Sequence, residues 1–132
     1  MNILLVDDDR TLAHSTAKLI QRLGGHNVDI TDEPTEIFWL CQAKNIDLVI
    51  MDVNLPGAQW QGQTVSGADI SRILKNHPRT ANIPIILVTA YAMLNERQAL
   101  LETSEADKFV AKPITDYAAL LELIHQLGSN VI

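Results

Sequence analysis

The sequence predicts an α/β fold, a doubly wound parallel sheet of five strands with helices on both of its faces. Short apolar runs alternate with helical patterns along the whole chain, which is typical of repeated βα units around a parallel sheet. These runs are rich in Val and Ile and do not alternate with polar residues, as in strands covered on both faces. Right-handed crossovers leave few topologies for such a chain, and the doubly wound sheet is the simplest.

Four apolar runs form the expected central strands, and each ends on a polar residue. The runs are residues 3–6, 48–51, 85–88 and 109–111, followed by Asp7, Asp52, Thr89 and Lys112. A weaker strand contains Val28 and Ile30. Parallel strands share a direction, so their carboxyl ends meet at one edge of the sheet, where ligands bind. We therefore expect these polar side chains in one crevice.

The first two helices follow the first and second strands. The first begins after Asp9 and ends at Gly24-Gly25, a glycine signal for a helix C-terminus. Its expected inward face is Leu12, Thr16, Leu19, Ile20 and Leu23. For the second helix, Asp32 is the expected cap and Pro34 lies in the first turn. Its inward residues are Ile37, Leu40 and Cys41.

The remaining three helices follow the later strands. Ser66 is the expected cap of a helix that Pro78 prevents from continuing. A fourth helix is expected over residues 95–103, and Asp116 begins a fifth. Residues 53–65 show neither helical nor strand periodicity, which indicates a long loop. Such loops are usually functional or mobile, and this one borders the crevice because it follows Asp52 directly.

Composition narrows the class of protein. A chain of 132 residues is one domain by length. No stretch has the roughly 20 apolar residues of a membrane span, and no basic leader region precedes the first strand. One cysteine fits a reducing compartment. We therefore expect a cytoplasmic protein without a membrane contact. A net charge of −6 with scattered basic residues argues against a nucleic-acid partner.

The predicted crevice has the chemistry of a phosphoryl site. Two carboxylates about 4 Å apart repel each other by roughly 4 kcal/mol at an effective dielectric near 20, so Asp7, Asp8 and Asp52 require a cation or a proton. With no His or Cys beside them, these carboxylates favour Mg²⁺. An ammonium, a hydroxyl and a metal stabilise a transferring phosphoryl group. A carboxylate can itself be the nucleophile and form an aspartyl phosphate.

Four segments carry a resemblance to a known family. They are LLVDDD, DLVIMDVNLPG, IPIILVTA and EADKFVAKPI, in the order and near the spacing of that family. The chain resembles the receiver domain of two-component response regulators, and the likeness covers nearly all of it. The resemblance implies a flavodoxin-like (βα)5 fold, a three-layer sandwich, with a receiver domain over residues 1–127. Residues 128–132 are then a short C-terminal tail.

The resemblance also implies roles for single residues. Asp52 is the phosphoacceptor, Thr89 follows the phosphoryl group, and Lys112 forms an ion pair with it. Mg²⁺ is held by the acidic pair Asp7 and Asp8, by Asp52 and by the backbone carbonyl of Asn54. Phe109 is the aromatic switch that moves together with Thr89. The Lys112-Pro113 bond is cis in the family, a conformation that is uncommon enough to be checked.

A receiver domain implies partners and a signalling role. A histidine kinase or a histidine phosphotransfer protein supplies the phosphoryl group, and an unidentified protein target receives the signal. A phosphorylation-dependent dimer is expected to form through the face of the fourth helix, the fifth strand and the fifth helix. The chain is not an enzyme in the usual sense, because it catalyses only its own phosphoryl transfer and autodephosphorylation.

Two features depart from the family pattern. Residues 53–65 look like an insertion, which shields Asp52, adds a docking surface or is neutral, since long surface loops cost little free energy. Tyr91 stands two residues after Thr89, at a position that tunes dephosphorylation together with Asn54. We expect its bulky ring to slow the attack of water on the phosphoryl group.

Other interpretations stay open at this point. Asp7-Asp8-Asp9-Arg10-Thr11 also fits the D-x-D-x-T signature of haloacid-dehalogenase-like phosphatases, with Asp7 as nucleophile and Asp9 as acid/base. A pseudo-receiver that binds partners without being phosphorylated is a second alternative. The same acidic run also suits plain helix capping, and Asp9 in particular favours a cap over a metal ligand. Phe109 equally fits an ordinary core position.

Overall fold

The computed structural model describes residues 1–43, 45–90 and 94–129 and shows a five-stranded parallel sheet between two layers of helices. The elements are β1 (Asn2–Val6), α1 (Arg10–Gly24), β2 (Asn27–Thr31), α2 (Pro34–Ala43), β3 (Leu48–Asp52), β4 (Gln59–Trp60), β5 (Gln63–Thr64), α3 (Gly67–Lys75), β6 (Ile85–Thr89), α4 (Leu94–Ser104), β7 (Lys108–Ala111) and α5 (Tyr117–Ser129). Among the described residues, no helix combines the length and apolar character that crossing a bilayer requires.

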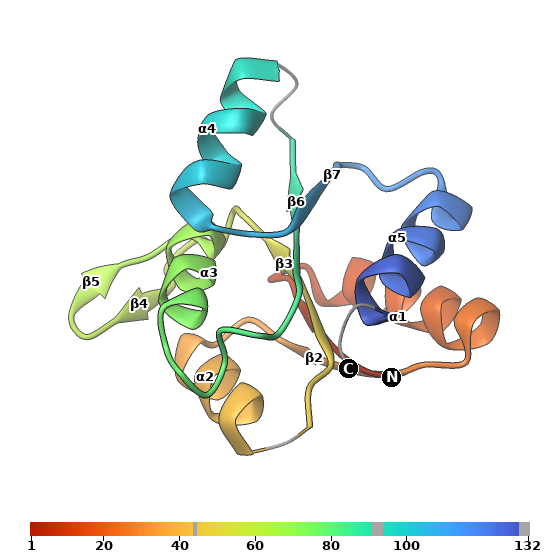
Figure 1. Cartoon of the computed structure of the whole chain (residues 1–132), viewed down its shortest axis with the longest axis horizontal. Coiled ribbons are helices and arrows are strands. Elements are labelled where there is room, and N and C mark those ends of the chain that lie inside the picture. The colour runs from red at the N-terminus through yellow and green to blue at the C-terminus, as the bar shows by residue number, and fades with distance from the viewer. Residues whose placement is uncertain (44, 91–93, 130–132) are drawn as a thin grey trace.

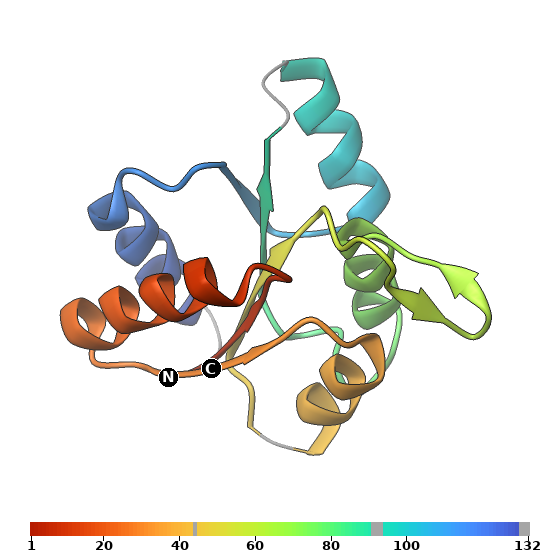
Figure 2. The ribbon, with the colours of Figure 1, turned by 180° about the vertical axis from the view of Figure 1, so that it is seen from behind.

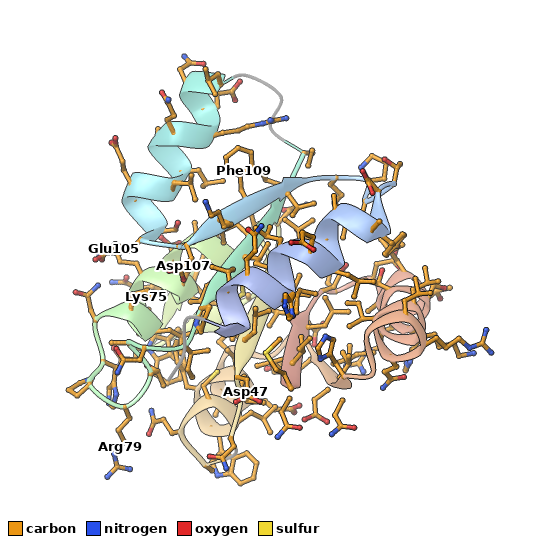
Figure 3. All side chains as sticks on the ribbon, turned by 45° about the vertical axis from the view of Figure 1, so that its right-hand side comes forward. Asp47, Lys75, Arg79, Glu105, Asp107 and Phe109 are labelled. Atoms are coloured by element: carbon orange, nitrogen blue, oxygen red, sulfur yellow. The ribbon has the colours of Figure 1, made fainter. Side chains whose placement is uncertain are left out.

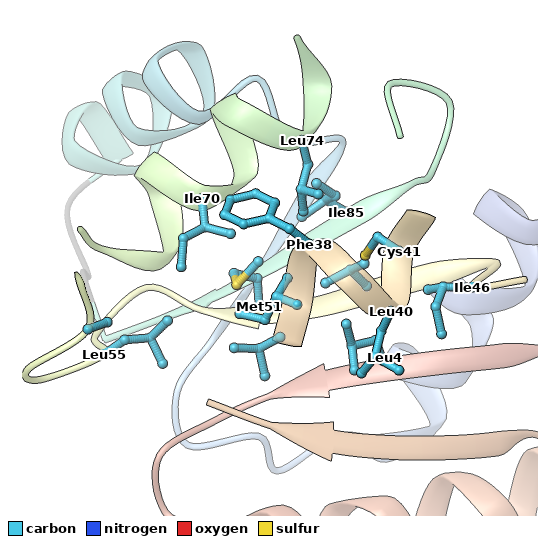
Figure 4. Packing of buried hydrophobic residues seen from close by; sticks show 14 of the residues in the cluster. Leu4, Phe38, Leu40, Cys41, Ile46, Met51, Leu55, Ile70, Leu74 and Ile85 are labelled. Atoms are coloured by element: carbon cyan, nitrogen blue, oxygen red, sulfur yellow. The ribbon is translucent and has the colours of Figure 1, made fainter. Parts of the chain in front are cut away.

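The sheet has the doubly wound order β2-β1-β3-β6-β7. Helices α1 and α5 cover one face, and α2, α3 and α4 lie on the other (Figures 1 and 2). The central strands are buried on both faces, and Leu4 faces the side of α2 and α3 while Ile3 faces the side of α1 and α5. Figure 4 shows the first of these two cores, where Phe38, Ile70 and Leu74 pack over Met51 and Ile85. The predicted fold class is confirmed.

Helix α1 packs through a stripe that matches the predicted one only at Thr16 and Ile20. Its buried residues are Ala13, Thr16, Ala17 and Ile20, whereas Leu12, Leu19 and Leu23 are 39%, 36% and 62% exposed. The buried set has the i, i+3, i+4, i+7 spacing of a helix face. Two of its members are alanines, which a search for large apolar side chains overlooks. The leucines lie along the border of that face instead of within it.

The helix ends match the sequence signals at three of four predicted caps. Asp9 caps α1, Asp116 accepts a hydrogen bond from Ala119 N at the start of α5, and Ser66 forms a reciprocal capping box with Asp69. The prediction for Asp32 was wrong. The chain before α2 turns on Thr31, whose hydroxyl accepts from Glu33 N, and Asp32 lies 3.5 Å from Arg10 instead.

The segment 53–65 contains a β-hairpin, a correction to the predicted irregular loop. β4 and β5 pair antiparallel around Gln61 and Gly62, whose φ angles of 52° and 78° suit a tight hairpin turn. The base is closed by Val65 N donating to Ala58 O. Trp60 packs on Phe38 of α2, with ring centroids 4.3 Å apart. Figure 1 shows the hairpin projecting beyond α3.

The structure describes the C-terminal helix α5 as far as Ser129, across the predicted boundary after residue 127. The division into a domain over 1–127 and a tail over 128–132 therefore stays a prediction, because residues 130–132 lie outside the described part of the chain.

Candidate functional site

The carboxyl ends of the central strands bring the predicted polar residues to one edge of the sheet. Asp52 ends β3 and Thr89 ends β6, while Asp7 and Lys112 directly follow β1 and β7. The parallel registers pair Asp52 with Val88 and Thr89 with Ala111, so these strand ends lie level with one another. The polar residues that follow four separate apolar runs are therefore neighbours in space.

Asp7, Asp8 and Asp52 form the acidic part of the site. One carboxylate oxygen from each lies within 4.8 Å of the others. Asp7 and Asp52 are buried, whereas Asp8 is exposed. Asp9 belongs to a different structure, because its side chain accepts from Leu12 N as the cap of α1. Of the four aspartates, the structure therefore gathers Asp7, Asp8 and Asp52 into one cluster and leaves Asp9 outside it.

Both oxygens of Asp52 already have hydrogen-bond donors. Lys112 Nζ donates to Oδ2 at 2.6 Å, and Asn54 N donates to Oδ1 at 3.0 Å. The Asp52 side chain is only 4% exposed, against 28% for Lys112. A buried carboxylate that is held in this way has a fixed orientation, as a nucleophile at the bottom of a cleft requires.

The charges of the cluster shift two pKa values. Burial raises the pKa of Asp7, a hydrogen bond from Asp9 N opposes that effect, and the Asp52 charge adds to it. Burial lowers the pKa of Lys112, but its hydrogen bond to Asp52 and the charges of the three carboxylates outweigh burial and raise it. Lys112 is therefore a firmly protonated cation, while Asp7 ionises at the cost of desolvation and repulsion.

A cleft of about 400 Å³ opens beside Asp52, and its walls include Asn54, Ser66, Thr89 and Lys112. Sequence reasoning placed Ser66 only as a helix cap and did not foresee it in this wall. Ser66 reaches the cleft because α3 begins against the end of β3. A Cβ on Gly67 would lie 1.9 Å from the carbonyl oxygen of Asp52, so the close approach of the two segments requires glycine there.

Two predicted residues lie outside this cluster. Phe109 is partly buried on β7, packs against the core beneath α4, and has the Arg97 guanidinium 5.1 Å from its ring centroid. Tyr91 falls outside the described residues, so its role in tuning dephosphorylation stays a prediction. The Lys112-Pro113 bond is cis, as the resemblance to receiver domains implied.

The donor set suits a hard divalent cation. Three carboxylates within 4.8 Å of one another concentrate negative charge that a single lysine does not balance. Oxygen-only donors of this kind favour Mg²⁺, which accepts one or two carboxylates and keeps positions for water and phosphate oxygens. With Lys112 and Thr89 on the opposite side of Asp52, the edge has the groups that stabilise charge on a transferring phosphoryl group.

Comparisons with known proteins agree with this geometry. The sequence profile of the response regulator receiver domain matches residues 3–125. Chemotaxis protein CheY of Pseudomonas aeruginosa is 30% identical over 117 residues, which cover 87% of this chain and 86% of that protein. The CAI-1 autoinducer sensor kinase/phosphatase CqsS of Vibrio cholerae is 33% identical over 114 residues, which cover 84% of this chain but 15% of that protein.

Solved structures share the fold along nearly the whole chain. The signal receiver domain of a signal transduction histidine kinase from Syntrophus aciditrophicus superposes with a TM-score of 0.82 at 26% identity, covering 98% of this chain and 91% of that chain. The receiver domain of sensor histidine kinase PA1611 from Pseudomonas aeruginosa matches with a TM-score of 0.78 at 22% identity, covering 98% of both chains. The PA1611 structure has a magnesium ion coordinated in its active site cleft.

Proposed function

The chain belongs to the response regulator receiver domain family, and from this membership we propose that Asp52 is its phosphoacceptor in two-component signalling. The observation that carries the assignment is the environment of Asp52. Asp52 is the most buried of the three clustered carboxylates, at 3% exposed, it is bound to Lys112, and it opens to the cleft that contains Thr89. A histidine kinase or a histidine phosphotransfer protein is the proposed donor.

In the proposed reaction, a carboxylate oxygen of Asp52 attacks the phosphorus of a phosphohistidine. A P–O bond to Asp52 forms as the P–N bond breaks, and the histidine nitrogen leaves with the bonding electron pair. Lys112 carries positive charge toward the transferred oxygens, and the Thr89 hydroxyl donates to them. Asp7, Asp8, Asp52 and the backbone carbonyl of Asn54 are the proposed Mg²⁺ ligands. When bound, Mg²⁺ supplies positive charge that offsets the charge of the phosphoryl oxygens.

The proposed output is a change of protein-binding surface. Thr89 and Phe109 shift together, and the change reaches the face of α4, β7 and α5, where a target protein or a second copy of the chain binds. A near-complete shift between two conformations needs roughly 5.5 kcal/mol of differential stabilisation. We propose residues 1–127 as the signalling domain, in the cytoplasm, where such kinases deliver their phosphoryl groups.

The experiment that tests the assignment compares Asp52→Asn with Asp9→Asn. With acetyl phosphate and Mg²⁺, intact-mass spectrometry is expected to show one added phosphoryl group on the parent and on Asp9→Asn. Asp52→Asn is expected to gain none, because its nucleophilic oxygen is lost. Asp9→Asn is the matched control, since Asn also caps helices well and the variant keeps the cap of α1.

The alternatives predict different results in the same experiment. Retained phosphatase turnover in Asp52→Asn with loss in Asp9→Asn would favour the dehalogenase-like phosphatase. A parent protein that binds neither the acetyl phosphate phosphoryl group nor beryllofluoride with Mg²⁺ would favour the pseudo-receiver. Either outcome removes Asp52 from the proposed role.

A further inference from the structure

Helix α4 has almost no buried face of its own. Of its eleven residues, all of them described, only Ser104 at the C-terminal end is buried, and Leu94 at the other end is 66% exposed. Leu100 packs, partly buried, against the core beneath this helix. A helix with so little buried surface gains little from packing and depends on particular contacts. The position of α4 therefore rests on the few residues that attach it to the body of the protein.

The C-terminal end of α4 is attached by a group of polar contacts that we call the anchor, made by Ser71, Lys75, Asn76, Ser104, Glu105 and Asp107. Ser71 Oγ donates to Ser104 O at 3.0 Å in a buried hydrogen bond, and Asn76 Nδ2 donates to Glu105 Oε2 at 2.6 Å. Both connect α3 with the end of α4. Figure 3 shows Lys75, Glu105 and Asp107 gathered at this end of the helix.

The anchor continues into the sheet through an ion pair. Lys75 Nζ lies 2.7 Å from Asp107 Oδ2 and also donates to Ile83 O at 2.8 Å. Asp107 Oδ2 accepts from Ile85 N at 2.8 Å, and Asp107 N donates to Ile85 O. The turn between α4 and β7 is thus joined to α3 and to the start of β6. This end of α4 has no freedom to move without breaking several hydrogen bonds.

Closer to the middle of α4, Arg97 contacts the aromatic ring of Phe109. Its guanidinium lies 5.1 Å from the centroid of the Phe109 ring, within the range of a cation–π interaction. Arg97 is one helical turn past the first residues of α4, and Figure 3 shows Phe109 well beyond the anchor along the helix. We call this contact the latch. At a partly exposed position it shifts an equilibrium by about two- to five-fold.

The latch is connected to Asp52 through β7. Phe109 and Lys112 lie three residues apart around the end of this strand, which pairs with β6 through Leu87 and Thr89. In this conformation Lys112 bonds directly to the Asp52 carboxylate, a contact that belongs to unmodified Asp52. On the proposed function of Asp52, a phosphoryl group there would offer Lys112 a new partner, and β7 is the segment that joins Lys112 to Phe109.

From these contacts we propose that α4 is a hinged arm, fixed by the anchor at Ser104 and released at the latch, and that Arg97 is a positioning residue that sets how easily Asp52 is phosphorylated. The second part rests on the proposed function of Asp52. Because the latch is formed in the conformation with unmodified Asp52, weakening it favours the phosphorylated conformation and speeds phosphorylation by linkage.

The test uses the full chain with Arg97→Ala, the conservative Arg97→Lys and the control Arg79→Ala. Arg79 is an exposed arginine on the loop after α3, far from the latch in Figure 3. Amide hydrogen exchange, resolved by residue with NMR, is expected to be about two- to five-fold faster at residues 98–100 in Arg97→Ala. Exchange at residues 101–105 and in the core strand β3 is expected to be unchanged.

The second readout is the initial rate of Asp52 phosphorylation by acetyl phosphate with Mg²⁺. Arg97→Ala is expected to react about two- to five-fold faster than the parent, Arg97→Lys to lie between them, and Arg79→Ala to match the parent. A rate that is unchanged or lower in Arg97→Ala overturns the role of Arg97. Faster exchange throughout the molecule, or equally at both ends of α4, overturns the hinge.

A further variant tests the fixed end. Ser71→Ala removes the buried hydrogen bond to Ser104, so exchange is expected to rise at residues 101–105 as well as at 98–100. Failure of the parent to become phosphorylated would refute the proposed function of Asp52, whereas the exchange pattern of α4 would still decide whether the arm is hinged. The two failures are therefore distinguishable.

Discussion

A lysine is bound to an aspartate at each end of the parallel strands, and the two pairs have different roles. Lys112 lies 2.6 Å from Asp52 at the carboxyl edge, and Lys75 lies 2.7 Å from Asp107 at the opposite edge. Around Lys75 the neighbours are neutral backbone groups, Ile83 O and Ile85 N, which complete the hydrogen bonding of the pair. Around Lys112 the neighbours are two further carboxylates, Asp7 and Asp8.

The difference lies in charge balance. The Lys75 pair is neutral and closed, as a structural contact should be, because every added partner satisfies a remaining donor or acceptor. The Lys112 site has a surplus of negative charge, three carboxylates against one ammonium, which a bound cation or a proton relieves. The lysine–aspartate distance is nearly the same in the two pairs, so it does not distinguish them. The groups that surround each pair do.

The largest expected contrast is in phosphorylation rate. Lys112→Met is expected to slow phosphorylation by acetyl phosphate about 100-fold, because a charge that stabilises the transition state is lost. Lys75→Met removes a lysine whose ion pair is about as short. Its phosphorylation rate is expected to stay within about two-fold of the parent rate. Time courses on phosphate-affinity gels measure both. Equal losses in the two variants would mean that Lys112 is only structural.

The free energy of unfolding in the presence of Mg²⁺ is expected to be affected more by Lys75→Met than by Lys112→Met. Lys75→Met removes the ammonium that Asp107 and Ile83 O share, although Asp107 keeps its hydrogen bond from Ile85 N. A loss of about 1–2 kcal/mol is expected in urea unfolding, since Asp107 is partly hydrated. Saturating Mg²⁺ is not expected to restore it. Lys112→Met is expected to be destabilised without Mg²⁺ and to recover when Mg²⁺ is added, because the cation can take the place of the ammonium among the carboxylates. Recovery of Lys75→Met by Mg²⁺ would contradict this distinction.

The smallest expected effect concerns Asp7. Burial raises the pKa of Asp7 above the usual 3.8, so the folded state favours the neutral carboxyl. The stabilisation of the folded state by neutral Asp7 is fully present below the unfolded pKa. It is lost as pH rises through the folded pKa. Asp7→Asn is therefore expected to raise the Tm by about 2–4 °C at pH 7 without Mg²⁺. The difference is expected to vanish below pH 3.8. Thermal unfolding at several pH values measures it, and a lower Tm at pH 7 would contradict it.

The carboxyl edge could be predicted from the sequence, whereas the opposite edge could not. Asp7, Asp52, Thr89 and Lys112 each follow an apolar run, and parallel topology alone then places them together. Lys75 and Asp107 have no such signal. They lie in a helix end and a turn that are 32 residues apart, and only the packing of α3 against β6 and α4 brings them together. Ser66 was likewise expected as a cap, but its place in the cleft depends on how closely Gly67 approaches β3.

The parts of the fold that were predicted wrongly also have local causes. The inner face of α1 was predicted correctly at Thr16 and Ile20, but its other positions were assigned to leucines because large side chains dominate a search for periodicity. Ala13 and Ala17 occupy that face instead. The hairpin was missed because its strands have two residues each, too few for a periodic pattern. Its turn is Gln-Gly, which lacks the Asn-Gly or Asp-Gly signal of such hairpins.

The single cysteine has a practical consequence for studying the molecule. Cys41 lies on the buried face of α2, 4% exposed, and burial raises its pKa to about 12. At pH 8 only about one thiol in ten thousand is then a thiolate, the form that reacts with maleimides and iodoacetamides. A cysteine introduced at an exposed position, such as Leu94→Cys at the free end of α4, is expected to be labelled selectively in the otherwise unaltered chain. The arm can therefore carry a spectroscopic probe without removal of the native thiol.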